Sequence, residues 1–275
     1  MHLNKRISNR KLFGGIFLSI LALIIAQVVA MSITVFGAVF SAILYIIFAF
    51  LLIFLLCHKV LKINLTDIRI LPFKVKGIWI ASAIILPTIV LLFLIFSGGE
   101  WKTANVSTIQ MLKVLFTSII CYGIAPAIVE EMVFRGVIMS LLENKFNRFI
   151  AIVCPSILFG ALHTIGNPMN VLSFIQLLVA GTLVGILFSL IAVESGSIWN
   201  SAIVHGLWNT VFIGSIMHIG NDNSAHAIFS YELISHSFII TGGDFGIEAS
   251  LPALIGYIIF IIFAYYRINK YGNEI

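Results

Sequence analysis

Apolar runs of about 20 residues recur along this chain and constrain its fold more than any other feature, because a membrane-crossing helix needs a run of that length. With 60% hydrophobic and only 10% charged residues, and a mean hydropathy of +1.12, the runs exclude a soluble domain. We expect an all-α fold: one polytopic membrane domain over residues 1–275, a bundle of about eight transmembrane helices. The expected spans are residues 12–33, 36–57, 78–97, 110–142, 149–166, 170–193, 197–218 and 249–266.

The distribution of charge predicts which loops face the cytoplasm. Loops rich in Lys and Arg stay on the cytoplasmic side, and an even number of spans puts the three basic segments of this chain on one side. The polar segment 219–248, on the other side, holds acids and no Lys or Arg. Both termini are therefore expected in the cytoplasm, and anionic headgroups explain the net charge of +5 without nucleic acid. The bases are Lys5, Arg6, Arg10, Lys11, Lys59, Lys62, Arg69, Lys74, Lys76, Arg267 and Lys270, and the acids of the polar segment are Asp222, Glu232, Asp244 and Glu248.

Few ionisable residues lie within the apolar runs. Each is a functional candidate, because a charge inside a bilayer costs about 2.5–3.5 kcal/mol on insertion scales. Glu143 and Glu194 fall instead at predicted cytoplasmic turns, where we expect them to lie in water. The candidates within the runs are Glu130, Glu131, Arg135, His163 and His205, with the polar Asn209 beside them.

Helix geometry predicts that four of these side chains reach a common depth. Glu130 and His163 flank the charged turn after the fourth span, and each lies about 20–25 Å from it at 1.5 Å per residue. His205 and Asn209 lie about 15–20 Å beyond the next tight turn, and their spacing of four places them on one helix face. We expect all four to share one cavity, an active site inside the bundle.

The adjacent acids Glu130 and Glu131 cannot both face that cavity, because consecutive helix residues point about 100° apart. Glu131 and Arg135 are four residues apart with the acid first, which is the favoured order for an intrahelical ion pair. We therefore assign Glu131 to Arg135, which leaves Glu130 free to work opposite His163.

The same cluster supplies the groups that hydrolysis of an acyl bond needs. A general base must take a proton from water and return it to the leaving amine, and Glu130 is suited to this role, with His163 orienting the water. The oxyanion that develops needs hydrogen-bond donors. His205 and Asn209 are the available pair.

Three motifs in this region resemble those of a known family. The sequences "EEMVFR", "FGALH" and "HGLWN" are similar to the EExxxR, FxxxH and HxxxN motifs of the CPBP intramembrane proteases, also called the type II CAAX prenyl endopeptidase or Abi family. The resemblance covers about residues 105–220 and implies an eight-helix membrane endopeptidase. The catalytic residues it implies are Glu130, His163, His205 and Asn209, and the supporting residues are Glu131, Arg135 and Phe159.

The resemblance also implies partners and a location. The substrate would be a membrane-associated peptide or protein, prenylated or not, and membrane lipid the other partner, with no nucleic acid. The expected type is a bacterial, bacteriocin self-immunity-like member in the plasma membrane.

Two alternatives stay open. Glu130, His163 and His205 would also serve as three zinc ligands with an open fourth position; the lack of an H-E-x-x-H pair, and the poor affinity of Asn for zinc, favour a mechanism that requires no cofactor. A non-catalytic immunity protein or a transporter would also place Glu, His and Arg in the membrane, although we find no internal repeat of broken helices typical of transporters.

Overall fold

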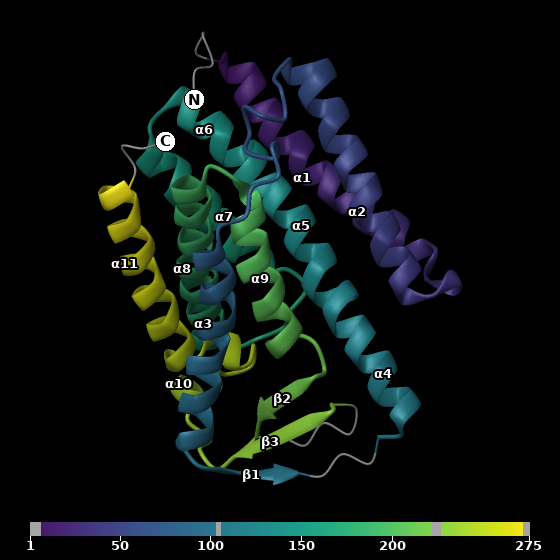
Figure 1. Ribbon diagram of the computed structural model, residues 1–275, viewed down its shortest axis with the longest axis vertical. Coiled ribbons are helices and arrows are strands. Elements are labelled where there is room, and N and C mark those ends of the chain that lie inside the picture. Colours follow the sequence, from purple (N-terminus) through teal and green to yellow (C-terminus); the bar gives the residue numbers. More distant parts are fainter. Residues whose placement is uncertain (1–6, 103–105, 222–226, 272–275) are drawn as a thin grey trace.

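Helices make up most of the molecule, as the apolar runs predict (Figure 1). The computed structural model describes residues 7–102, 106–221 and 227–271, so Lys5, Arg6 and Asp222 lie outside the described residues. The helices are α1 Asn9–Ser32, η1 Thr34–Phe36, α2 Ala38–Leu55, η2 Leu56–Leu61, α3 Gly77–Phe96, α4 Thr108–Thr117, η3 Ser118–Ile124, α5 Ala125–Glu131, η4 Met132–Ile138, α6 Met139–Lys145, α7 Arg148–His163, α8 Val171–Ser195, α9 Ile198–Phe212, α10 Phe238–Thr241, η5 Ile247–Ala249 and α11 Leu251–Tyr271.

Six helical stretches among the described residues are long and apolar enough to cross a membrane, which makes this a multi-pass membrane protein. The predicted count of about eight is not confirmed. The predicted spans 149–166 and 197–218 correspond to α7 and α9, which have 16 and 15 residues. Helices of that length extend about 22–24 Å, less than the roughly 30 Å of a bilayer core. The six stretches are Asn9–Ser32, Ala38–Leu61, Gly77–Phe96, Thr108–Lys145, Val171–Ser195 and Leu251–Tyr271.

A small sheet closes one end of the bundle and was not predicted (Figure 1). Its strands β1 Gly99–Lys102, β2 Met217–Gly220 and β3 Phe229–Leu233 lie in the order β1-β3-β2. Strand β3 pairs antiparallel with β1 and parallel with β2. The strands have only four or five residues, and β1 pairs with β3 more than a hundred residues along the chain, so no local pattern predicts the sheet.

The opposite end of the bundle carries the start of α1 and the end of α11 (Figure 1). The prediction that Glu143 and Glu194 lie in water at this end is wrong. The side chain of Glu194 is 1% exposed and that of Glu143 is 14% exposed. Both form ion pairs. The basic segment between α2 and α3 supplies Arg69 for Glu143 and Lys76 for Glu194, while α7 supplies Arg148 and α11 supplies Arg267. Glu194 also accepts a hydrogen bond from Trp79.

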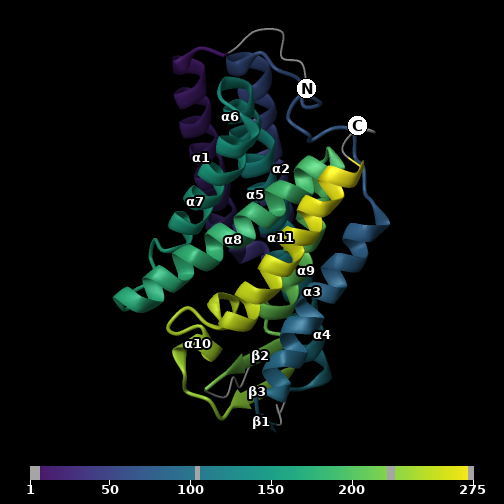
Figure 2. The same cartoon turned by 90° about the vertical axis from the view of Figure 1, so that its left-hand side faces the viewer.

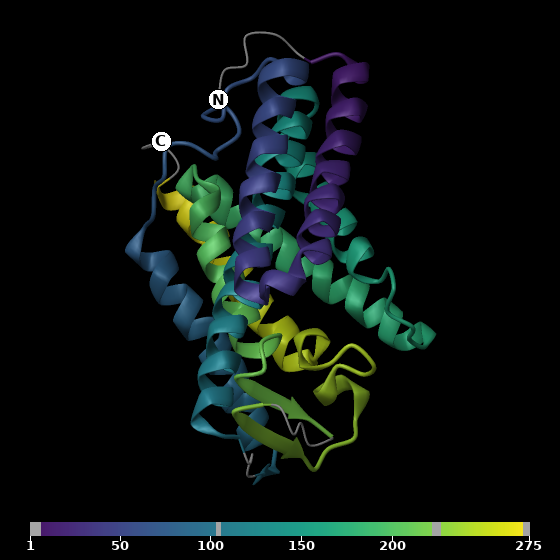
Figure 3. The same ribbon diagram turned by 90° about the vertical axis from the view of Figure 1, so that its right-hand side faces the viewer.

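Two hydrophobic clusters form the core and meet at the centre of the bundle. One gathers residues of α1, α2, η4 and α6 and includes Phe159 of α7. The other gathers residues of α3, α8, α9 and α11 and includes Phe188 and Trp208. Helix α8 lies between α7 and α11 in Figure 2, and Figure 3 shows α1 and α2 side by side at the edge of the molecule. The candidate site residues lie where the two clusters meet.

The stretch from α4 to α6 is continuous but contains two π-helical segments, η3 and η4, on either side of α5. Such widened turns are frequent at functional sites. Pro126, at the start of α5, lacks the N–H that a regular α-turn would use. A Cβ on Gly123 of η3 would lie 2.8 Å from the carbonyl oxygen of Gly206. Glycine at this position therefore lets α9 pack closely enough to bring its polar face to α5.

Candidate active site

The two adjacent acids at the end of α5 occupy different surroundings, as predicted from the 100° turn between neighbouring residues. The side chain of Glu131 is fully buried, at 0% exposed. That of Glu130 is 20% exposed, and no hydrogen bond to its Oε2 atom is found among the described residues. Glu131 is therefore a structural ion, while Glu130 keeps an oxygen available for a further partner.

Glu131 binds three side chains from two helices. Arg135 Nη1 donates to its Oε1 atom at 2.8 Å, so the predicted ion pair is present. Ser201 Oγ donates to its Oε2 atom at 2.6 Å, and His205 Nδ1 lies 3.2 Å from Oε1. Ser201 and His205 both belong to α9, so this carboxylate joins α5 to α9 as well as neutralising Arg135. The contact of Glu131 with Arg135 was predicted from the sequence, whereas its contact with His205 was not.

Arg135 is itself enclosed by aromatic rings. Its Nη2 atom donates to the carbonyl oxygen of Gly185 at 3.0 Å. Its guanidinium carbon lies 4.7 Å from the ring centroid of Phe159 and 5.3 Å from that of Phe188. A guanidinium over ring faces gains a favourable cation–π interaction. These contacts allow a full positive charge to remain in the apolar interior.

His205 of α9 lies between the two acids. Its Nδ1 atom faces Glu131, and its Nε2 atom is 3.8 Å from Glu130 Oε2. The ring stacks on Phe188 with centroids 4.7 Å apart. With Nδ1–H given to Glu131, as this geometry assigns it, Nε2 donates a hydrogen bond only when the ring carries both protons.

His163 is the last residue of α7. Its Nδ1 atom lies 2.8 Å from the carbonyl oxygen of Phe159, one turn earlier, and therefore donates to it. This bond leaves Nε2 as an acceptor. The Phe159 ring lies 4.5 Å from the imidazole, so Phe159 positions His163 with both its ring and its backbone, consistent with the supporting place expected for it.

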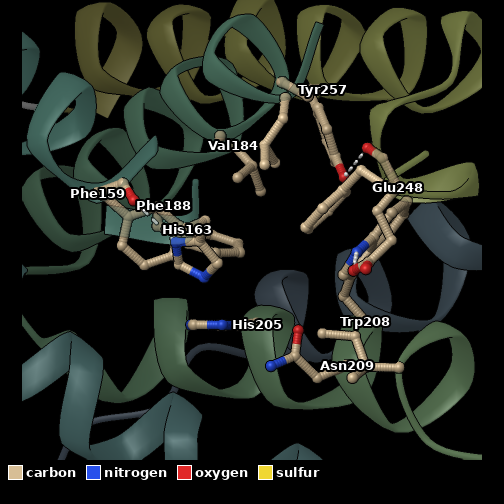
Figure 4. Close-up of a pocket in the computed structure, with 14 residues that line it drawn as sticks. Phe159, His163, Val184, Phe188, His205, Trp208, Asn209, Glu248 and Tyr257 are labelled. Atoms are coloured by element: carbon tan, nitrogen blue, oxygen red, sulfur yellow. Dashed lines mark hydrogen bonds between the residues drawn. The ribbon is translucent and has the colours of Figure 1, made fainter. Parts of the chain in front are cut away.

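A cavity of about 60 Å³ lies beyond the two histidines (Figure 4). His163, His205 and Asn209 line one side of it, and the carboxamide of Asn209 points into it. Asn209 follows His205 by one turn of α9 and is 6% exposed. Its amide group is therefore a buried hydrogen-bond donor beside both imidazoles.

Glu130 lines a second, larger cavity of about 420 Å³. His163 lines both cavities, whereas His205 and Asn209 line only the smaller one. The prediction that all four residues share one cavity is therefore wrong in detail. The imidazole of His163 lies between the two cavities, because α7 ends there and His163 is its last residue.

Glu248 of η5 also lines the smaller cavity and was missed by the sequence argument. Its Oε1 atom accepts a hydrogen bond from Trp208 Nε1 at 3.1 Å. Burial raises the pKa of this carboxyl, against the smaller opposing effect of the Trp208 hydrogen bond and of His163 and His205. A hint was present in the sequence, since residues 219–248 hold acids without any Lys or Arg to pair them.

Comparison with known proteins gives one family match. Residues 112–211 match the family model described as type II CAAX prenyl endopeptidase Rce1-like. The matched segment begins in α4 and ends in α9, so it contains Glu130, Glu131, Arg135, His163, His205 and Asn209. A search of curated proteins found no match.

Proposed function

Because its residues 112–211 make this chain a member of the Rce1-like type II CAAX prenyl endopeptidase family, we propose that it is an intramembrane endopeptidase that uses Glu130 to activate water. Family membership supports a CAAX-type protease. The observation that carries the mechanism is the contrast between the acids. Glu131 is fully buried and bonded to Arg135 and α9, while the partly exposed Glu130 lines a cavity and makes no hydrogen bond to the described residues.

The attacking water is held in the larger cavity. Glu130 and His163 both line it. The carboxylate of Glu130 has no hydrogen bond among the described residues and is an acceptor, as is His163 Nε2. One water has two hydrogens, so it can donate one to each acceptor at the same time. Glu130 removes its proton as the oxygen attacks the carbonyl carbon of the substrate, and His163 orients the oxygen.

The oxyanion that forms is stabilised from α9. Asn209 donates through its amide in every protonation state. His205 adds a second donor, Nε2–H, when its ring carries both protons; its two ring nitrogens face Glu131 and Glu130. The intermediate then collapses: the C–N bond breaks, Glu130 returns its proton to the leaving amine, and the water oxygen remains in the new carboxylate.

The larger cavity also indicates where the substrate enters. Its wall combines residues of α1, such as Ile20 and Gln27, with Leu162 of α7. A wall that combines apolar side chains with polar ones such as Gln27 and Asn167 suits a peptide held within or beside the bilayer. The proposed substrate is accordingly a membrane-associated peptide or protein; whether it is prenylated, and whether the chain serves bacteriocin self-immunity, stay predictions.

We place the protein in the plasma membrane with both termini in the cytoplasm. The support is the charge distribution: the bundle end that carries the start of α1 and the end of α11 also holds the bases Arg69, Lys76 and Arg267. The positive-inside rule assigns such an end to the cytoplasm.

The test uses purified protein and a detergent extract of membrane proteins in water enriched in oxygen-18. Hydrolysis places the heavy oxygen in each new carboxyl terminus, which mass spectrometry detects without knowledge of the substrate. A transporter or binding protein would produce no labelled termini. The expected result is a defined set of labelled cleavage sites.

Replacing His163 by Ala is expected to lower the rate of label incorporation by about 100-fold, because the water loses one of two acceptors. The matched control is His58→Ala, since His58 is exposed and its ring contact is with Phe54, outside the site. Equal rates for His163→Ala and the control would contradict the water-orienting role.

Zinc is the alternative for the same residues. Zinc-bound histidines commonly donate their other ring nitrogen to a carbonyl or carboxylate, as His163 and His205 do here. However, the described residues include no group of three His, Cys, Asp or Glu side chains placed to hold a metal ion. The residues as arranged do not fit zinc, and no step of the mechanism is assigned to it.

Chelation tests this assignment. Protein treated with a strong chelator, and shown by elemental analysis to be free of zinc, is expected to keep its full cleavage rate. Loss of activity on chelation, with recovery when zinc is added back, would replace the glutamate mechanism by a metal-dependent one.

A further inference from the structure

Glu248, which is half-buried, differs from three acids whose side chains are at most 14% exposed, Glu131, Glu143 and Glu194. Each of those three has an Arg partner, because a buried charge is costly unless it is paired. No Lys or Arg lies within ion-pair distance of Glu248 among the described residues. The pairs of the other acids are Glu131 with Arg135, Glu143 with Arg69 and Glu194 with Arg267.

The carboxyl of Glu248 is nevertheless firmly placed. Trp208 Nε1 donates to its Oε1 atom, and the Tyr257 hydroxyl donates to its backbone oxygen, both at 3.1 Å. No hydrogen bond to Oε2 is found among the described residues, and the side chain lines the smaller cavity. Figure 4 shows Glu248 across that cavity from His163. One oxygen thus faces a space whose other side is the candidate active site.

The space between them has the size of one unbranched side chain. Its volume is about 60 Å³, and one water-sized group needs about 10–15 Å³, so it holds roughly four to six such groups. A lysine side chain, with four methylenes and an ammonium, fits this number. The walls are apolar and aromatic, including Val184, Phe188 and Tyr257, which suits methylenes and, at the rings, a cation.

We propose that this cavity is a specificity subsite that takes one lysine side chain of the substrate beside the scissile bond, with Glu248 as the partner of its ammonium. The subsite rests on the proposed function, since it opens at His163 and Asn209. The scissile carbonyl lies beside His163, the residue that lines both cavities, with its oxygen toward Asn209; the rest of the substrate backbone lies in the larger cavity and one side chain enters the smaller. Lysine is favoured because it supplies the cation that Glu248 lacks.

The first arm of the test reads the labelled cleavage sites. Wild-type sites are expected to be enriched in lysine at one position beside the scissile bond, and Glu248→Gln is expected to lower the preference for lysine over norleucine in a synthetic substrate by about 10–100-fold. Glu248→Lys should replace the lysine preference by one for Asp or Glu. Val184→Phe fills the cavity without touching Glu248, and should also abolish the preference if the charge variants fail to fold.

The second arm needs no catalysis. n-Butylammonium, a lysine side-chain analogue, is added to Glu130→Gln protein and its contact is read by saturation-transfer NMR, with n-butanol as the uncharged probe. Binding is expected for n-butylammonium only, is expected to disappear in Glu130→Gln/Glu248→Gln, and should persist when Glu232 of β3, which lines neither cavity, is changed to Gln instead. Absence of this Glu248-dependent binding overturns the subsite.

The two arms of the test distinguish failure of the proposed protease function from failure of the proposed subsite. A wild-type protein that cleaves nothing but binds n-butylammonium through Glu248 contradicts the proposed function and supports the subsite. Cleavage without lysine enrichment, or an enrichment that survives both Glu248→Gln and Val184→Phe, overturns the subsite and leaves the protease intact.

Discussion

Glu130→Gln is expected to lower the cleavage rate by about 10⁴-fold, the upper end for removal of a general base, without loss of the fold. The amide has nearly the same shape as the carboxylate but cannot accept a proton from water. The fold should persist because no hydrogen bond to Glu130 Oε2 is found among the described residues and the side chain keeps a partly open face. Labelled carboxyl termini measure the rate, and thermal unfolding in detergent measures the stability.

The matched control is Glu100→Gln. Glu100 lies in β1, its side chain is 71% exposed, and its partner is Lys102. This variant carries the same chemical change far from the site and should cleave at the wild-type rate. A Glu130→Gln protein that is folded and cleaves at the rate of Glu100→Gln would refute the mechanism.

Glu131→Gln is expected to damage stability and activity together. It leaves the guanidinium of Arg135 buried without its counter-ion, and removal of one partner from a buried pair costs about 3–5 kcal/mol. His205 simultaneously loses the carboxylate that holds its Nδ1 atom. The free energy of unfolding, from denaturant titration in mixed micelles, and the cleavage rate should therefore both fall. Unchanged stability would show that Arg135 is neutralised by other means.

A double variant separates the two losses. Glu131→Gln with Arg135→Met removes both charges, and replacement of a whole buried pair by uncharged groups is far better tolerated than removal of one partner. Stability should recover in part, whereas activity should not, because His205 still lacks its carboxylate. If activity returned with stability, Glu131 would act only on Arg135 and have no part in placing the imidazole.

The sequence predicts the helical bundle because length and hydropathy are local properties. It also predicts the separation of Glu130 from Glu131 and the pairing of Glu131 with Arg135, since both follow from helix periodicity within six residues. The prediction that Glu143 and Glu194 lie in water fails because distant parts of the chain supply their partners: Arg69 and Lys76 from the segment before α3, and Arg267 from α11. The sheet is not predicted for the same reason, because β1 pairs with a strand more than a hundred residues further along the chain.

Within the site, the rise per residue of a helix predicts that His163, His205 and Asn209 lie in one region. It does not predict which cavity each of them lines. The division into two cavities depends on where α7 ends, and helix ends are poorly marked by apolar patterning. The hydrogen bond between His205 and Glu131 depends on the close approach of η3 and α9 at Gly123. The position of Glu248 depends on the loop that folds back toward α9, where Trp208 donates to its carboxylate. These features are tertiary and have no signature in a single sequence.

The short helix α7 has a consequence for the supply of water. It has 16 residues and ends at His163, where the chain leaves the helix for a polar loop that contains Asn167 and Asn170. A helix shorter than the hydrocarbon core creates a hydrophobic mismatch, which thins the bilayer locally or draws polar groups inward. We therefore expect the bilayer to be thinned beside His163, the residue proposed to orient the attacking water, so that water has a short path from bulk solvent to the site.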